Sequence, residues 1–158
     1  IEPPINEIKK QLIDFSEKFV NNHVLKTYLD EALYPNGAVK YLLSEYCKED
    51  FTIEKYKTFQ IEHIFSKDPN FNIHSYGFSG DYDYEKNRIG NLGLLEQGLN
   101  IGASNLPPIN KVSGYLNSVV TDTRNLAGEI QNGNYNKLNV DARRDKIIEF
   151  CLERFKLN

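Results

Sequence analysis

Methionine and tryptophan are absent from this chain of 158 residues, and cysteine occurs only twice. Because the first residue is Ile1 and not methionine, we expect the chain to be a fragment of a longer protein or a processed product. Cys47 and Cys151 do not belong to a Cys-x-x-Cys pair, which disfavours a zinc site with four protein ligands. We expect both to be reduced residues of the core, since cysteine outside disulfides is among the most buried residue types.

Long apolar runs and a positive net charge are also lacking. No stretch approaches the ~20 apolar residues that a membrane-spanning helix requires, and no signal peptide is visible, so we expect a soluble, cytoplasmic protein. The net charge of −3 disfavours a strong general binder of nucleic acids, whose affinity comes largely from clustered lysine and arginine. It does not exclude a nuclease, because a catalytic site built on carboxylates itself adds negative charge.

Apolar residues recur every three or four positions over most of the chain, which is the period of an amphipathic helix. Ile5, Ile8, Leu12, Phe15 and Phe19 form such a stripe, and it predicts a packing helix over residues 5–20. Further helices are expected over residues 24–33, 38–46, 109–120, 121–130 and 140–157, and a short one after Thr52, whose hydroxyl can cap it.

Two short segments are predicted to be strands. Residues 60–65 place Ile61 and Phe65 on one face and Glu62 on the other, and a second apolar run covers residues 91–95. Residues 96–105 can follow as a helical turn or two. The sequence therefore predicts an α+β fold that is mostly α-helical and contains one small β-hairpin.

The segment between the two strands, residues 66–88, is rich in Asn, Asp, Gly, Ser and Tyr and has no clear period. It is longer than most loops of compact domains, and such loops are often functional or mobile. A strand, a loop, a strand and a helix in this order would bring Glu62, His63 and Asn100 within reach of one another. Taken alone, however, an acid beside a histidine is usually a structural ion pair.

Several motifs of this region occur together: Glu62-His63-Ile64, the run Ile89-Gly90-Asn91-Leu92-Gly93-Leu94-Leu95, Leu99-Asn100, Ser104-Asn105, Lys111 and Tyr115. The pattern resembles the C-terminal HNH nuclease domain of GmrSD-type restriction endonucleases, which are modification-dependent (type IV) enzymes, and of related phage-defence proteins. Two positions depart from the family pattern, with Ser66 in place of a proline and Pro108 in place of a phenylalanine.

The resemblance implies a metal-dependent DNA endonuclease that hydrolyses phosphodiester bonds in modified or foreign DNA. The hairpin and the following helix would form a ββα-metal (HNH, or His-Me finger) site. His63 would be the general base, and Asn91 would pin the loop that orients it. Glu62 and Asn100 would bind Mg²⁺ or Mn²⁺, which prefer oxygen ligands.

Contacts with the substrate are implied for four further residues. Lys111 could hold a phosphate, and Asn105 could support the substrate or the helix turn. Arg143 and Arg144 lie near the start of the expected final helix, where basic residues oppose the helix dipole, so they could face an anion. A solvated face, or a pair with Asp141 or Asp145, is an equally open interpretation.

The resemblance covers the whole chain, which we expect to be a single domain over residues 1–158. Residues 1–59 would be helical support, residues 60–105 the metal-binding core with the long loop 66–88, and residues 106–158 a helical C-terminal part. The expected partners are DNA and an N-terminal nucleotide-hydrolysing or sensing domain of the same protein.

Two other classes of function remain open at this stage. The chain could be a catalytically inactive HNH-like module that binds nucleic acid or protein. It could also be a purely structural helical interaction domain, which would have no affinity for metal.

Overall fold

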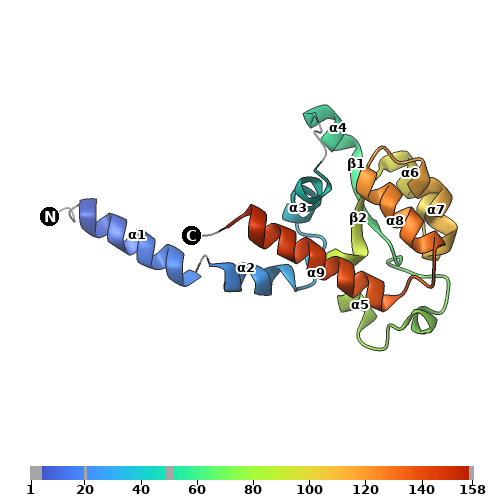
Figure 1. The fold of residues 1–158 in the computed structure, drawn as a ribbon, viewed down its shortest axis with the longest axis horizontal. Coiled ribbons are helices and arrows are strands. Elements are labelled where there is room, and N and C mark those ends of the chain that lie inside the picture. Colours follow the sequence, from blue (N-terminus) through green and yellow to red (C-terminus); the bar gives the residue numbers. More distant parts are fainter. Residues whose placement is uncertain (1–4, 20, 49–51, 157–158) are drawn as a thin grey trace.

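In the computed structural model of the chain, residues 5–19, 21–48 and 52–156 are described, and most of them are helical (Figure 1). Within these ranges no helix combines the length and the apolarity needed to cross a membrane. The helices are α1 (Ile5–Phe19), α2 (Asn22–Leu29), α3 (Ala38–Cys47), α4 (Ile53–Thr58), α5 (Tyr82–Glu85), α6 (Gln97–Ala103), α7 (Pro108–Leu116), α8 (Thr121–Gln131) and α9 (Lys137–Arg154), with 3₁₀ turns η1 (Ile73–Tyr76) and η2 (Ile89–Asn91).

The sheet has two antiparallel strands, β1 (Phe59–His63) and β2 (Leu92–Glu96), with Glu62 opposite Gly93. Helix α6 follows β2 directly and contacts both strands. The predicted fold class is confirmed as a mostly helical α+β protein with a two-stranded antiparallel sheet, and the ββα-metal site within it stays a prediction.

The first strand ends two residues earlier than the sequence predicts. Beyond His63 the backbone is hydrogen-bonded to Asn91, in the turn before β2. Ile64 N donates to Asn91 O at 2.9 Å, and Phe65 N donates to Asn91 Oδ1 at 2.8 Å. The prediction that Ile61 and Phe65 share one face is therefore wrong. Ile61 packs against one core cluster, and Phe65 lies in the other.

Buried apolar side chains form these two clusters on opposite faces of the sheet. Leu94 belongs to the first cluster and Leu95 to the second, as expected for successive residues of a strand. The first cluster joins the sheet to α2, α3 and α9, and it contains the fully buried Cys151, with the half-buried Cys47 at its edge. The second joins the sheet to α6, α7 and α8.

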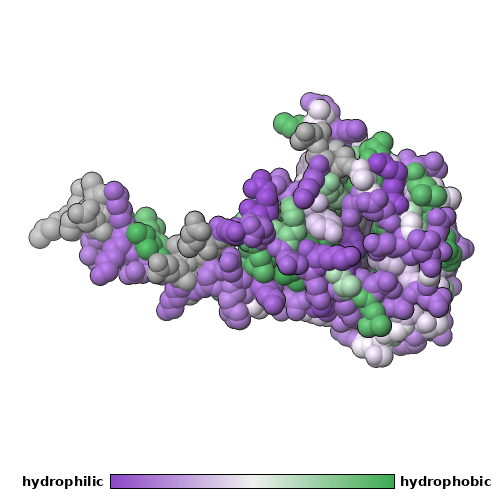
Figure 2. Space-filling view, viewed as in Figure 1, coloured by the Kyte–Doolittle hydropathy of each residue, from purple (hydrophilic) through white to green (hydrophobic). Residues whose placement is uncertain are grey.

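Helix α1 forms as predicted but does not pack on the core. It extends away from the rest of the chain (Figure 1), and apolar surface is visible on it (Figure 2). The exposed fraction is 43% for Ile8 and 63% for Leu12. The prediction of a packing helix is therefore wrong for the described part of α1, because both cores are completed by other helices.

Side-chain caps decide where several helices begin. Thr52 accepts a hydrogen bond from Lys55 N at 3.2 Å, which confirms the predicted cap of α4. Helix α9 begins at Lys137, earlier than predicted, because Asn136 and Asn139 cap it reciprocally. Arg143 and Arg144 therefore lie beyond its first turn, so the premise that they oppose the helix dipole is wrong.

The turn η2 lies directly against α9, and Gly90 permits this close approach. A Cβ atom at Gly90 would collide with the backbone of Val140 and Arg144, lying only 2.9 Å from Arg144 N. Only a residue without a side chain fits here. The glycine of the Ile-Gly-Asn run is thus a packing requirement between the candidate site and the C-terminal helix.

The long segment 66–88 contains more regular structure than its sequence indicates. It includes η1 and α5, and the side chain of Asp81 caps α5 by accepting from Tyr84 N at 3.3 Å. Phe78 is buried in the second core, and the hydroxyl of Tyr82 donates to Ser66 O at 2.6 Å. The segment therefore packs over the second core and supports the residues that follow β1.

Candidate active site

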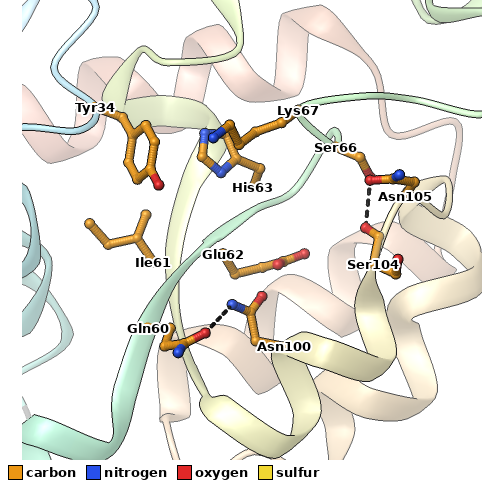
Figure 3. Close-up of a pocket in the computed structure, with 10 residues that line it drawn as sticks. All are labelled: Tyr34, Gln60, Ile61, Glu62, His63, Ser66, Lys67, Asn100, Ser104 and Asn105. Atoms are coloured by element: carbon orange, nitrogen blue, oxygen red, sulfur yellow. Dashed lines mark hydrogen bonds between the residues drawn. The ribbon is translucent and has the colours of Figure 1, made fainter.

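A cavity of about 480 Å³ opens beside the end of β1 and the C-terminal half of α6 (Figure 3). It brings together four of the predicted site residues, Glu62, His63, Asn100 and Asn105. The other predicted residues, Asn91, Lys111, Arg143 and Arg144, are not part of its lining. The remaining lining residues are Tyr34, Gln60, Ile61, Ser66, Lys67 and Ser104.

His63 is the last residue of β1, and its side chain is almost fully buried. Its Nε2 lies 3.2 Å from Asn87 Oδ1, and the ring of Tyr34 meets it edge-on with centroids 4.7 Å apart. The pKa of His63 is lowered to about 4, mainly by burial and to a smaller extent by the ammonium groups of Lys67 and Lys111, while the Asn87 hydrogen bond opposes the shift. The imidazole is therefore neutral near pH 7.

Glu62 lies in the cavity wall on a buried network. Its Oε1 accepts from Lys111 Nζ at 2.6 Å and from the Tyr115 hydroxyl at 2.8 Å. Burial raises the pKa of Glu62, while Lys111 and its hydrogen bonds oppose that rise. Both of these side-chain bonds end on Oε1.

Lys111 does not lie on the surface of the cavity. Its side chain is fully buried, and besides Glu62 it donates to His63 O at 2.7 Å. Burial lowers the pKa of Lys111, and the Glu62 carboxylate opposes that shift. The observed role is to neutralise Glu62 and to hold the backbone of His63, and its contact with a phosphate stays a prediction.

Asn91 is fully buried and fastens the segment that follows His63. Its amide accepts from Phe65 N at 2.8 Å and donates to Phe65 O and to Lys86 O, both at 2.9 Å. These bonds hold the backbone at Phe65 and Lys86, and the predicted role of Asn91 in orienting His63 stays a prediction. A ligand role would require the amide to face the cavity, and here it is fully engaged with backbone groups.

Asn100 approaches Glu62 from α6. Its Nδ2 donates to Gln60 Oε1 at 3.0 Å, and Figure 3 shows its amide oxygen turned toward the Glu62 carboxylate. Two acceptor oxygens that face each other in this way favour a cation between them. Across residues 5–19, 21–48 and 52–156, no group of three or more His, Cys, Asp and Glu side chains is arranged to hold a metal ion.

Ser66 and Asn105 line the far side of the cavity. The Ser66 hydroxyl is placed to bond with Ser104 O at 3.1 Å and Leu106 O at 2.9 Å, which ties the end of the β1 segment to the loop after α6. This serine, which replaces the family's proline, therefore fixes the local backbone by side-chain bonds. Pro108, the other departure, begins α7, where proline is favoured.

The two arginines of α9 face anions within the protein. Arg143 is buried and donates to Asp122 Oδ2 at 2.7 Å and to Leu92 O at 2.8 Å, which holds β2. Arg144 pairs with Asp141 at 3.2 Å and with Asp145 at 2.8 Å, as the second interpretation of its sequence context predicts. Contacts of either arginine with a substrate stay predictions.

Three residues at the site are missing from the sequence prediction: Tyr34, Lys67 and Asn87. Tyr34 is distant in sequence, and only the fold brings its ring to His63. Lys67 follows the Glu-His strand by four positions, and among the described lining residues it is the one cationic side chain. Asn87 lies two residues before the Ile-Gly-Asn run, and this proximity was the only signal in the sequence that could have linked it to the site.

The family model described as "GmrSD restriction endonucleases, C-terminal domain" matches residues 3–150. The chain belongs to this family. No curated protein and no solved structure matches the chain. Membership in the GmrSD C-terminal domain family confirms the predicted resemblance, and it connects the chain with restriction and with nuclease function.

Proposed function

We propose that the chain is a metal-dependent HNH endonuclease domain that hydrolyses phosphodiester bonds of modified or foreign DNA. The observation that carries the proposal is the cavity itself, in which a neutral histidine, a carboxylate and an amide oxygen converge from a strand and a helix. Family membership supports the same conclusion independently of this geometry.

His63 acts as the general base. Because its pKa lies near 4, the ring has a free lone pair near pH 7 and can take a proton from water. The oxygen of that water attacks phosphorus, the bond from phosphorus to the 3′ oxygen breaks, and the 3′ oxygen takes up a proton from solvent. Asn91 and Lys111 hold the backbone on the two sides of the ring, at Phe65 and at His63 O.

Glu62 Oε2 and Asn100 Oδ1 would hold Mg²⁺ or Mn²⁺. These two oxygens fit such an ion, because Mg²⁺ is usually bound by one or two protein oxygens and keeps water and phosphate as its other ligands. When bound, the ion would stabilise negative charge on the phosphate and on the leaving oxygen. Lys111 lowers the charge that Glu62 presents to the cavity, which favours weak, exchangeable binding.

The substrate phosphate would lie beside Lys67. Its ammonium sits 5.0 Å from the centroid of the Tyr34 ring, at the cavity that contains His63. Lys111 and Arg143, in contrast, are engaged inside the protein. An exposed lysine at a cleft is a suitable partner for a phosphate.

A module that binds DNA without cutting it is the second candidate. The small number of acidic metal ligands favours it, since Glu62 is the one carboxylate among the described lining residues and is already paired with Lys111. It predicts binding of DNA with no hydrolysis in any divalent metal.

Plasmid nicking tests the proposal. Wild-type protein, His63→Ala and the control His23→Ala, which alters an exposed histidine of α2, are compared in Mg²⁺, Mn²⁺ and EDTA. We expect metal-dependent nicking by wild type and control, and a loss of about 100-fold or more in His63→Ala. Circular dichroism verifies that each variant folds.

Calorimetry with Mn²⁺ separates the alternatives. Wild-type protein that binds Mn²⁺ and DNA but leaves plasmid intact would support the non-cutting module. Absence of any Mn²⁺ binding, or full activity of folded His63→Ala, would overturn the proposed mechanism.

A further inference from the structure

We propose that Asn87 is a positioning residue that fixes the His63 ring in the tautomer with its proton on Nε2. The inference rests on the proposed role of His63 as general base. Asn87 lies between α5 and η2, outside the motif that identifies the family, and its oxygen is the hydrogen-bond partner of the ring.

The orientation of the Asn87 amide is fixed by its other contact. Its Nδ2 donates to Asp83 O at 2.9 Å, and a backbone carbonyl can only accept hydrogen bonds. The nitrogen of the amide must therefore face Asp83, which leaves Oδ1 facing the imidazole. Because Oδ1 can only accept, His63 Nε2 must carry the proton of the bond between them, at 3.2 Å.

The other ring nitrogen is then the one with the lone pair. Within the described part of the chain, the Tyr135 hydroxyl is the one buried side-chain polar atom without a hydrogen-bond partner. His63 Nδ1 forms none of the described hydrogen bonds and is not a buried atom without a partner, so it is accessible, and His63 lines the cavity. Asn87 thus directs the basic nitrogen of His63 toward the space where water and substrate would lie.

Asn87 also supports the ring from its second side. Its backbone oxygen accepts from Tyr34 N at 3.2 Å, and the Tyr34 ring packs edge-on against His63 at an interplanar angle of 83°. One residue therefore fixes both the proton on the imidazole and the aromatic wall beside it. Asn91 has a different task, because it holds the backbone at Phe65 and does not touch the ring.

The tautomer can be measured directly by ¹⁵N NMR of the histidine rings near neutral pH, since the chain contains only three histidines. We expect His63 to show the Nε2–H tautomer. His74 serves as an internal reference with the opposite tautomer, because its Nδ1 lies 2.7 Å from Phe78 O. An unchanged His74 signal in each variant shows that the fold is intact.

Three variants give the test. Asn87→Ala should lose the preference for Nε2–H at His63, whereas Asn87→Asp, which keeps an acceptor oxygen, should retain it. Asn117→Ala is the matched control, because the Asn117 amide also donates to the carbonyl four residues earlier, at 2.9 Å, but lies away from the cavity. In nicking assays Asn87→Ala should lower kcat about 10- to 100-fold with little change in KM.

The NMR result does not depend on nuclease activity, so the two proposals can fail separately. An Nδ1–H tautomer in the wild type, or a His63 spectrum unaffected by Asn87→Ala, would overturn the role of Asn87. A confirmed tautomer in a protein that never nicks DNA would instead overturn the proposed function and leave the positioning of the ring established.

Discussion

Lys111 Nζ lies 2.6 Å from Glu62 Oε1, and both side chains are almost completely removed from solvent. The pair places a carboxylate in the wall of the candidate active site at a position where burial raises its pKa and the lysine opposes that rise. Removing the lysine would leave the buried Glu62 carboxylate without its cationic partner. The energetic cost of that change is the first prediction.

Lys111→Met should lower the free energy of unfolding by about 3–5 kcal/mol, the usual cost of breaking one side of a buried ion pair. Urea unfolding measures it. Lys156→Met is the control, because Lys156 forms an exposed pair with Glu153 at 2.7 Å, and exposed pairs contribute about 0–1 kcal/mol. Equal effects of the two substitutions would contradict the buried-pair interpretation.

Gly90→Ala should destabilise the protein by several kcal/mol, since the new methyl group would meet the backbone of α9 at Val140 and Arg144. Gly93→Ala is the matched control from the same run, because a Cβ there meets no atom within 4 Å. Thermal unfolding of both variants measures the difference. A Gly90→Ala protein as stable as Gly93→Ala would show that η2 and α9 are not in close contact.

Stability of the metal-free protein should fall as the pH is lowered from neutral. Burial lowers the pKa of His63 from 6.5 to about 4, so between these values the unfolded chain binds a proton that the folded protein does not. The full loss is about 3 kcal/mol, and it is absent above the ordinary pKa of histidine.

Urea unfolding from pH 7 to pH 4 in EDTA measures this dependence. Glu62, whose pKa is raised, takes up a proton in the folded state and acts in the opposite direction, so the comparison is between wild type and His63→Gln. His63→Gln should remove the histidine contribution, and His23→Gln, at an exposed position, should not. Identical pH profiles for wild type and His63→Gln would refute the lowered pKa.

Lys67→Ala should weaken DNA binding about fivefold and reduce the salt dependence of binding by about one ion, as expected for a single phosphate contact. Fluorescence anisotropy of a labelled duplex in EDTA, at several salt concentrations, measures both quantities. Lys26→Ala changes the charge equally on the exposed surface of α2 and should leave them unaltered. Equal losses in the two variants would mean that Lys67 contributes only general charge.

Several elements could be predicted from the sequence because their signals are local. The apolar period predicted most helices, Thr52 marked the start of α4, and the two apolar runs predicted the sheet. The spacing of Glu62, His63 and Asn100 indicated a shared site, and these side chains line one cavity. The predicted helix ends were less accurate. The start of α9 is set by the cap of Asn136 and Asn139, and these polar residues leave no mark in the apolar pattern from which the helix was predicted.

The sequence by itself determined most helices, the two strands and the family. Apolar periodicity and motif spacing involve residues that are close together in the chain, so they can be read without knowledge of tertiary contacts. Only the tertiary structure decided which charges face the cavity. Lys111 reaches Glu62 across 49 positions and Arg143 reaches Asp122 across 21, and each pairing depends on how the helices pack. The same dependence left Asn87 unrecognised, because its bond to His63 spans 24 positions and forms only once the segment between the strands has folded back over the site.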